Sequence, residues 1–233
     1  MALMRLDEIV RGSGKFTRKQ IISLVNEGRV TVDGLPAEGI SQKCSPDWDI
    51  RVDGEPVVME PLLCLMLHKP AGYITATVSD REPPVTDLLP PEYRHFFPVG
   101  RLDMDSEGLL LLTNDGSLCH RIIMPACAIQ KEYYIEVTGN FAPDTEARFR
   151  EGIEADNGLQ CLPAGIEIAA DGRSAIVRVT EGKRHQVKRM AAAAGARVRY
   201  LKRLAIGNLR LDENLVPGQW KILSEEEIQK IFA

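Results

Sequence analysis

Four charged side chains are concentrated in the short segment from Gly100 to Gly108, namely Arg101, Asp103, Asp105 and Glu107. Carboxylates gathered in this way could bind a metal ion or act together as acid and base in hydrolysis. A calcium loop would need a bidentate glutamate where the chain has Asn114, and the residues before Asn114 form an apolar run. Asp103 and Asp105 would point to opposite faces of a strand, or diverge on a loop, so their spacing does not support a cooperating pair. An acidic turn without chemistry is the third interpretation.

Basic residues dominate the segment from Glu181 to Arg203, which holds eight lysines and arginines but one acidic residue, in a chain with a net charge of −4. Apolar residues at helical spacing predict a helix over residues 184–194. Its apolar stripe consists of Val187, Met190, Ala191 and Ala194. Arg184 and Lys188 would share another face, with Arg189 beside them, and like charges four residues apart repel each other. Repulsion between these basic side chains is expected where a bound phosphate offsets it. The alternative interpretation is a solvated helix face without a ligand.

A second basic cluster lies near the N-terminus and consists of Arg11, Lys15, Arg18 and Lys19. These residues lie around the start of a helix for which Thr17 and Gln20 form a capping box. The positive end of the helix dipole would add to the side-chain charges and suit a phosphate. Two basic clusters in two parts of the chain therefore predict an extended polyanion as the partner, rather than a small phosphate compound.

The first sixty residues are expected to form a small module. Apolar residues at helical spacing predict helices around residues 6–10 and over residues 17–28. Two short strands should follow, each ending in an Asp-Gly turn, at residues 29–34 and 50–54. The segment 54–61 is predicted to be the linker to the rest of the chain.

The remaining residues, 61–233, are expected to form a second domain. Strands are predicted at residues 62–67, 109–112, 133–137 and 176–179, and helices at residues 144–152, 184–194 and 225–232. Strands and helices are mixed without strict β-α-β alternation. The sequence therefore predicts an α+β fold, with a small N-terminal αβ module at residues 1–60 and a mostly antiparallel mixed sheet in the second domain.

The composition is that of a folded protein, because 44% of the residues are hydrophobic and 27% are charged, which excludes a disordered chain. The longest apolar run is as short as a strand, so we expect no membrane-spanning segment. The first ten residues lack the apolar core of a signal peptide, and we expect a cytoplasmic protein. Five scattered cysteines without a C-x-x-C pair argue against a disulfide framework and against a zinc site.

Several segments match a known pattern in order and spacing. They are Gly100-Arg-Leu-Asp103 followed by Ser106-x-Gly-Leu-x-Leu-x-Thr113-x-Asp115-Gly116, and then Leu67-x-Lys69-Pro-x-Gly72-Tyr, Lys131-x-Tyr133 and Glu181-Gly-x-x-His185-Gln-Val-Lys188-Arg-Met190. Together they resemble the signature of bacterial rRNA pseudouridine synthases of the RsuA-like family, the branch that modifies small-subunit ribosomal RNA. Residues 1–60 resemble the RNA-binding module of a small-subunit ribosomal protein, so the resemblance covers nearly the whole chain.

The resemblance implies that the chain converts a uridine to pseudouridine. The glycosidic bond would break, the uracil would turn and its carbon 5 would be joined to the sugar, which requires no cofactor and no metal. Asp103 would be the catalytic carboxylate, either as a nucleophile or as a base, and Lys188 would keep it ionised. Tyr133 would stack on the uracil. Arg101 would bind a phosphate or keep open the gap that the extruded nucleotide leaves. The histidines expected to be structural are His68, His95, His120 and His185.

The resemblance also implies the partner, which would be ribosomal RNA or a ribosomal assembly intermediate bound by a monomer. Its phosphates would be held by Lys15, Arg18, Lys19, Arg184 and Arg189. Two alternatives remain open, namely a synthase acting on large-subunit rRNA and a non-catalytic RNA-binding protein of ribosome assembly. The short chain without a basic tail favours the small subunit, and the set Asp103, Tyr133 and Lys188 favours an enzyme.

Overall fold

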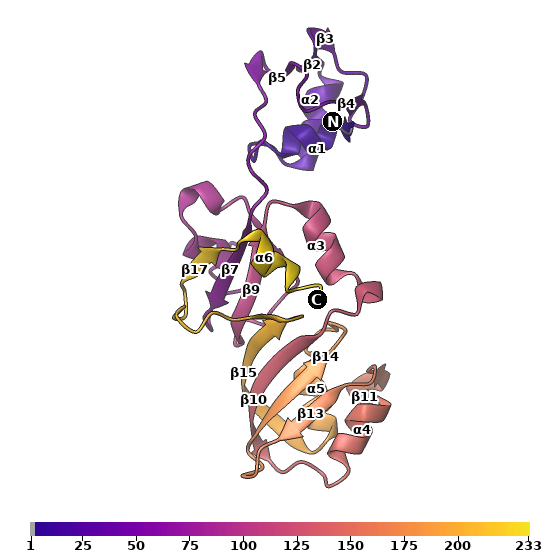
Figure 1. Cartoon of the computed structure of the whole chain (residues 1–233), viewed down its shortest axis with the longest axis vertical. Helices are drawn as coiled ribbons and strands as arrows, with labels where there is room; N and C mark the ends of the chain where they lie inside the picture. The colour runs from indigo at the N-terminus through magenta and orange to yellow at the C-terminus, as the bar shows by residue number, and fades with distance from the viewer. Residues whose placement is uncertain (1–2) are drawn as a thin grey trace. The chain divides into compact units, whose positions relative to one another are not determined.

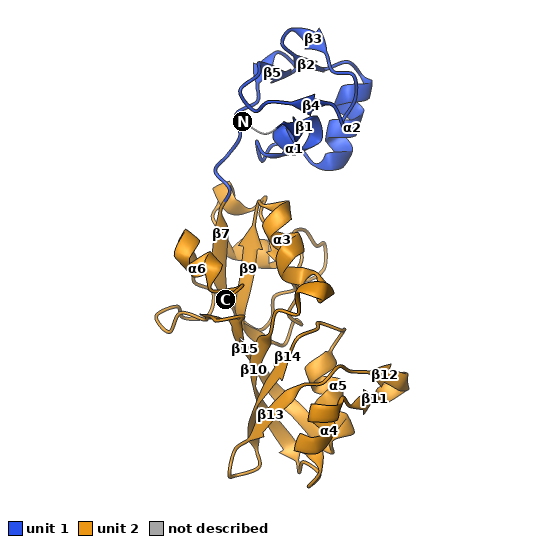
Figure 2. Cartoon of the chain, turned by 45° about the vertical axis from the view of Figure 1, so that its right-hand side comes forward, with its two compact units in different colours: residues 1–62 blue, residues 63–233 orange. Residues whose placement is uncertain are grey.

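Two compact units make up the chain in the computed structural model, which describes residues 3–233 (Figure 1). The units are Met1–Leu62 and Leu63–Ala233 (Figure 2), so the division falls two residues after the boundary expected from the sequence. Each unit has a hydrophobic core of its own and is described by itself. Within residues 3–233, no helix has the length and apolar character that crossing a membrane would require.

The first unit packs two helices against short strands. The elements are β1 (Met4–Arg5), α1 (Leu6–Arg11), α2 (Arg18–Asn26), β2 (Val30–Val32), β3 (Leu35–Pro36), β4 (Lys43–Cys44), β5 (Ile50–Val52) and β6 (Glu55–Pro56). β3, β2, β5 and β6 form an antiparallel sheet in this order, and β1 pairs with β4. The Thr17 hydroxyl accepts from the Gln20 backbone N–H at 3.3 Å and the Gln20 side chain accepts from the Thr17 N–H at 2.8 Å, so the predicted capping box is confirmed.

The two Asp-Gly turns of the first unit are also confirmed. Both residues of each turn have positive φ angles, 51° and 81° at residues 33–34 and 53° and 82° at residues 53–54. This conformation is typical of the tight turn that joins two antiparallel strands. The second turn leads into β6, so the prediction that residues 54–61 form a linker is wrong for Glu55–Pro56, which pairs with β5.

The second unit is built on a nine-stranded sheet. Its elements are β7 (Cys64–Lys69), β8 (Phe97–Val99), β9 (Glu107–Thr113), α3 (Gly116–Ile123), β10 (Lys131–Gly139), α4 (Thr145–Glu151), β11 (Glu154–Ala155), β12 (Leu159–Gln160), β13 (Gly165–Ile168), β14 (Ser174–Val179), α5 (Gln186–Ala193), β15 (Ala196–Ile206), β16 (Leu209–Arg210), β17 (Trp220–Ile222) and α6 (Glu225–Gln229). Short 3₁₀ helices cover Val85–Leu88, Pro91–Tyr93, Pro125–Cys127 and Asp156–Gly158.

The strands of the sheet follow the order β13-β14-β10-β15-β9-β7-β17, with β16 beside β15 and β8 beside β9. Every pair is antiparallel except β15 and β9, which run parallel over two residue pairs. The predicted α+β fold with a mostly antiparallel mixed sheet is confirmed. β11 and β12 form a small hairpin of their own.

The central strands β7 and β9 are covered on both faces, which explains why their sequences are unbroken apolar runs. Leu65, Leu67, Leu110 and Leu112 belong to one core, and the alternating residues Cys64, Met66, Leu109 and Leu111 belong to another. Residues of α5 pack in the first core, and residues of α3 pack in the second. The two cores therefore lie on opposite faces of one sheet.

Most predicted helices are confirmed, with one informative difference. The helix predicted over residues 184–194 begins only at Gln186, because His185 has a left-handed backbone with a φ of 53°. Arg184 therefore precedes the helix, and the prediction that it shares a helical face with Lys188 is wrong. The predicted apolar stripe is confirmed, since its four members are all buried in the larger core. The last helix begins at a Ser224 capping box as predicted but ends at Gln229.

Candidate active site

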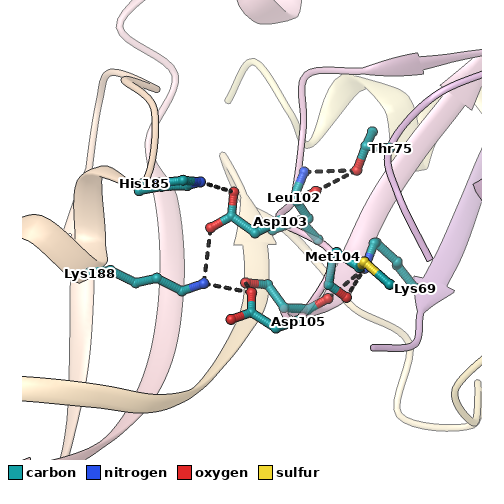
Figure 3. Close-up of polar contacts among 9 residues, drawn as sticks. Lys69, Thr75, Leu102, Asp103, Met104, Asp105, His185 and Lys188 are labelled. Atoms are coloured by element: carbon teal, nitrogen blue, oxygen red, sulfur yellow. Dashed lines mark hydrogen bonds and ion pairs between the residues drawn. The ribbon is translucent and has the colours of Figure 1, made fainter. Parts of the chain in front are cut away.

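The acidic segment before β9 is fixed by the turn that follows β7. The Lys69 ammonium, completely buried, donates to the carbonyl oxygens of Ser106 at 2.7 Å, Pro70 at 2.9 Å and Met104 at 3.4 Å. The Gly72 backbone N–H also donates to Met104, at 2.8 Å. Burial lowers the pKa of Lys69 to about 8, because its partners are neutral carbonyl groups at hydrogen-bonding distance. The Lys69 ammonium therefore fixes the backbone on either side of Asp105 (Figure 3).

The residue before Asp103 is fixed in a similar way by Thr75. Its hydroxyl donates to the Leu102 carbonyl at 2.6 Å and accepts from the Leu102 N–H at 3.1 Å. A backbone hydrogen bond from Ser106 N–H to the Asp103 carbonyl at 3.1 Å closes the turn. The position of Asp103 is thus determined by backbone contacts on both sides.

Close approach of β9 and β15 places the second half of the site. Gly108 pairs with Arg203, and a Cβ atom added to Gly108 would lie 2.2 Å from the Arg203 carbonyl oxygen, so glycine is required there. The buried Arg203 guanidinium donates to the carbonyls of Leu109 at 2.7 Å and Arg101 at 3.4 Å. Through Arg203, strand β15 is therefore hydrogen-bonded to the backbone at both ends of the acidic segment.

The turn before α5 and the first turn of this helix carry His185 and Lys188 of the site. The buried Gln186 side chain accepts from the Lys183 backbone N–H at 3.0 Å and donates to the Glu181 carboxylate at 2.7 Å. These bonds fix the left-handed turn at His185. The apolar face of α5 is buried, and Lys188 therefore projects from the opposite side of its first turns.

Two side chains, Lys188 and His185, approach the carboxylate of Asp103, and Lys188 also contacts its neighbour Asp105 (Figure 3). The Lys188 Nζ lies 3.1 Å from Asp103 Oδ2 and 2.6 Å from Asp105 Oδ1. The His185 Nε2 lies 3.5 Å from Asp103 Oδ1. Burial opposes the charge on Lys188, but its hydrogen bonds to Asp105 and Asp103 outweigh that effect and raise its pKa above the ordinary value. Lys188 is thus a permanent cation between two carboxylates.

Asp103, His185 and Lys188 line one small open cleft with a volume of about 80 Å³. Arg101, Asp103, Tyr133 and Lys188 all lie on its wall, together with the apolar side chains of Val179, Val187 and Leu201. Tyr133 is only 9% exposed and comes from β10, next to β15 in the sheet. A cleft with an aromatic ring, apolar walls and one ion pair can hold a planar base beside a carboxylate.

The remaining predicted RNA-binding residues lie outside this cleft. Arg184 is exposed on the turn before α5, whereas Arg189 binds the carboxylate and the backbone carbonyl of Asp156. Lys15, Arg18 and Lys19 are exposed in the first unit, where Arg18 also pairs with Asp7 at 3.4 Å. Arg189 is therefore engaged within the chain, while Arg184, Lys15 and Lys19 present exposed side chains.

Sequence reasoning missed three features of the site. The spacing argument that Asp103 and Asp105 would diverge is wrong, because both carboxylates reach the same ammonium. His185, expected to be structural, faces Asp103. Lys69, noted only as part of a motif, supports the acidic segment. Its position at the end of an apolar strand was a signal, since a lysine buried there needs several acceptors.

Comparisons with known proteins agree with this geometry. The family model described as RNA pseudouridylate synthase matches residues 64–193. The chain belongs to this family. An RNA pseudouridine synthase of Bacillus subtilis named YtzG, described as uncharacterised, is 41% identical over 231 residues, which cover 97% of each chain. The ribosomal small subunit pseudouridine synthase A of Escherichia coli is 35% identical over 98% of this chain and 100% of its own length.

A solved structure supports the same assignment. A crystal structure of a pseudouridylate synthase superimposes with a TM-score of 0.71 at 31% identity, over 98% of this chain and 99% of that one. The full-length matches place the chain in the RsuA-like branch of pseudouridine synthases, as the sequence motifs predicted. An RNA pseudouridine synthase is an isomerase that modifies a base already built into a polynucleotide.

Proposed function

We propose that this pseudouridine synthase isomerises one specific uridine in small-subunit ribosomal RNA, with Asp103 as its catalytic carboxylate. The observation that carries the proposal is the Asp103 carboxylate, which lies in a cleft with Tyr133 and is paired with Lys188 at 3.1 Å. The small-subunit target is supported by relatives named ribosomal small subunit pseudouridine synthase A, which match over nearly their whole length.

In the proposed reaction, the target uridine is extruded from its stack so that its sugar and base reach Asp103. The bond between the sugar carbon 1′ and the base nitrogen 1 breaks, and the uracil turns within the cleft. Carbon 5 then bonds to carbon 1′ and gives up its hydrogen as a proton, while nitrogen 1, which kept the electron pair of the broken bond, takes up a proton. Asp103 serves either by adding to the sugar or by removing a proton from it, and both roles need an ionised carboxylate.

The other residues of the cleft have distinct roles in the proposal. Lys188 opposes the desolvation that RNA imposes on Asp103 and keeps the carboxylate charged. Tyr133 stacks on the uracil while the base is detached. Arg101, exposed at the rim, contacts the RNA next to the extruded nucleotide. No step of this isomerisation calls for a redox group or a metal.

Binding outside the cleft is assigned to exposed basic residues. In the first unit these are Lys15, Arg18 and Lys19, and in the second unit Arg184. They would contact phosphates and supply affinity that does not depend on base sequence. Arg189 contributes less to phosphate binding, because its guanidinium already pairs with Asp156. The proposed enzyme acts as a monomer in the cytoplasm, on free rRNA or on an assembly intermediate.

The test is pseudouridine mapping of ribosomal RNA from cells that lack the gene, complemented with the wild type or with Asp103→Asn. We expect one position of small-subunit rRNA to lose its pseudouridine, and only the wild type to restore it. A missing position in large-subunit rRNA would move the target to that subunit. Complete modification in the deletion strain would instead favour a non-catalytic role in ribosome assembly.

A further inference from the structure

The ammonium of Lys188 is shared between two carboxylates, and the sharing is unequal. Its distance to Asp105 Oδ1 is 2.6 Å, compared with 3.1 Å to Asp103 Oδ2. The Asp105 side chain is 72% exposed, whereas the side chains of Asp103 and Lys188 are 31% and 25% exposed. The shorter contact is thus made with the more exposed carboxylate, which is not among the residues that line the cleft.

This arrangement has a simple charge balance. Two carboxylates and one ammonium leave a net charge of −1 when His185 is neutral. The hydrogen bond and charge of Lys188 outweigh the effect of burial on Asp105 and lower its pKa, so Asp105 is charged at neutral pH. Other titratable groups near the cluster are His185, at 3.5 Å from Asp103, and the buried Lys69, which also interacts with Glu107 and Arg203. One cation therefore serves a pair of carboxylates that repel each other.

We propose that Asp105 is a positioning residue that holds Lys188 between the two carboxylates and so limits how tightly Lys188 pairs with Asp103. This proposal rests on the proposed function of Asp103. A carboxylate that is tightly neutralised by one ammonium is a weaker nucleophile and a weaker base than one that shares the ammonium. Lys188 thus keeps Asp103 ionised, while Asp105 keeps the ionised carboxylate reactive.

The backbone supports such a role. The carbonyl oxygens of Met104 and Ser106, on either side of Asp105, are both bonded to the Lys69 ammonium. The main chain of Asp105 is therefore anchored, although its side chain lies exposed. An exposed acid on an anchored backbone has a fixed reach to Lys188, which lies 83 residues further along the chain.

The experiment compares the wild type with Asp105→Asn in a single-turnover assay on rRNA labelled with tritium at carbon 5 of uridine, over a range of pH. Tritium is released when carbon 5 bonds to the sugar. We expect roughly fivefold lower plateau activity in Asp105→Asn, the size typical of one partly exposed ion pair. We also expect the acid-side midpoint of its pH profile to move down by roughly half a pH unit, because a neighbouring negative charge is gone. Asp105→Glu keeps the charge and should restore the wild-type midpoint.

Two further variants distinguish a role through Lys188 from a general effect of charge. Glu92→Gln removes an exposed acid from the same unit and should leave the midpoint unchanged. In a Lys188→Met background, adding Asp105→Asn should shift the midpoint clearly less than in the wild type, because Asp105 acts through Lys188. An unshifted or upward-shifted midpoint in Asp105→Asn, or an equal shift in both backgrounds, would overturn the inference. A wild type inactive on rRNA would instead contradict the proposed function.

Discussion

Replacement of Lys188 by methionine tests the central ion pair most directly. The change removes the ammonium 3.1 Å from Asp103 and keeps a side chain of similar length. Two unit charges about 4 Å apart interact by about 4 kcal/mol at an effective dielectric constant of about 20. Because both side chains are partly exposed, we reduce this value to about 2 kcal/mol, which corresponds to roughly 1.5 pH units or a thirtyfold change in ionisation.

The sign of the effect follows from the charge that is removed. Without the ammonium, the carboxylate in the RNA complex ionises only at higher pH, so the acid-side midpoint of the kcat profile should rise by roughly 1.5 units. The loss of kcat should be greatest in acid and become smaller as the pH increases. The assay is tritium release from rRNA under single-turnover conditions between about pH 5 and pH 8.5.

A matched control lies at the next position of the same helix. Arg189→Met also removes one positive charge from α5, but this cation binds Asp156 instead of Asp103. Its midpoint should stay at the wild-type value, while any weakening of RNA binding through net charge is shared by both variants. A loss of kcat in Lys188→Met that is the same at every pH, or an equal midpoint shift in both variants, would refute the reasoning.

Three further predictions concern stability and RNA binding. Gly108→Ala should lower the free energy of unfolding by more than about 3 kcal/mol in urea denaturation, because its Cβ would overlap the strand at Arg203, whereas Gly172→Ala, with open space around it, should cost about 1 kcal/mol. Lys69 binds its proton less tightly when folded, with a pKa of about 8 against an ordinary 10.5, so the unfolded chain holds more protons between these values. The stability difference between wild type and Lys69→Met should therefore shift by about 2–3 kcal/mol in favour of the wild type from pH 7 to pH 10, and a constant difference would contradict the lowered pKa. Glutamine at three exposed basic positions of the first unit should weaken RNA binding and reduce its salt dependence, by about 0.7–0.9 in logarithmic slope for each phosphate that is no longer neutralised. The positions are Lys15, Arg18 and Lys19. Filter binding at several salt concentrations measures this, with Arg51→Gln as the control because Asp49 already binds that arginine.

The sequence predicted those parts of the fold that depend on neighbours along the chain. The capping boxes at Thr17 and Ser224 involve residues three positions apart, and both formed as expected. The apolar run at residues 109–112 predicted a strand, and β9 forms there with both of its faces buried, because strands alternate their side chains between two surfaces. The apolar stripe of α5 was predictable for the same kind of reason, since its spacing repeats with the helix.

Other predictions failed where a single residue changed the local backbone. The helix predicted to start at residue 184 starts at Gln186, because His185 has a left-handed conformation that helical periodicity does not reveal. This difference in backbone conformation matters for the proposed active site. The same turn that shortens the helix places the His185 ring beside Asp103.

The sequence by itself made Asp103 the candidate for the catalytic carboxylate, because the type and order of residues around it resemble a family signature. Only the tertiary structure decided which groups surround that carboxylate. The order β10-β15-β9 in the sheet, with β15 parallel to β9, brings Lys188 and Tyr133 to one cleft. The tertiary structure also showed that Asp105 shares the Lys188 ammonium with Asp103. Arg189 does not face the cleft but binds Asp156. The physical reason is that charge pairing acts across space, over more than eighty residues of chain here, whereas periodicity and capping report only on a few adjacent turns.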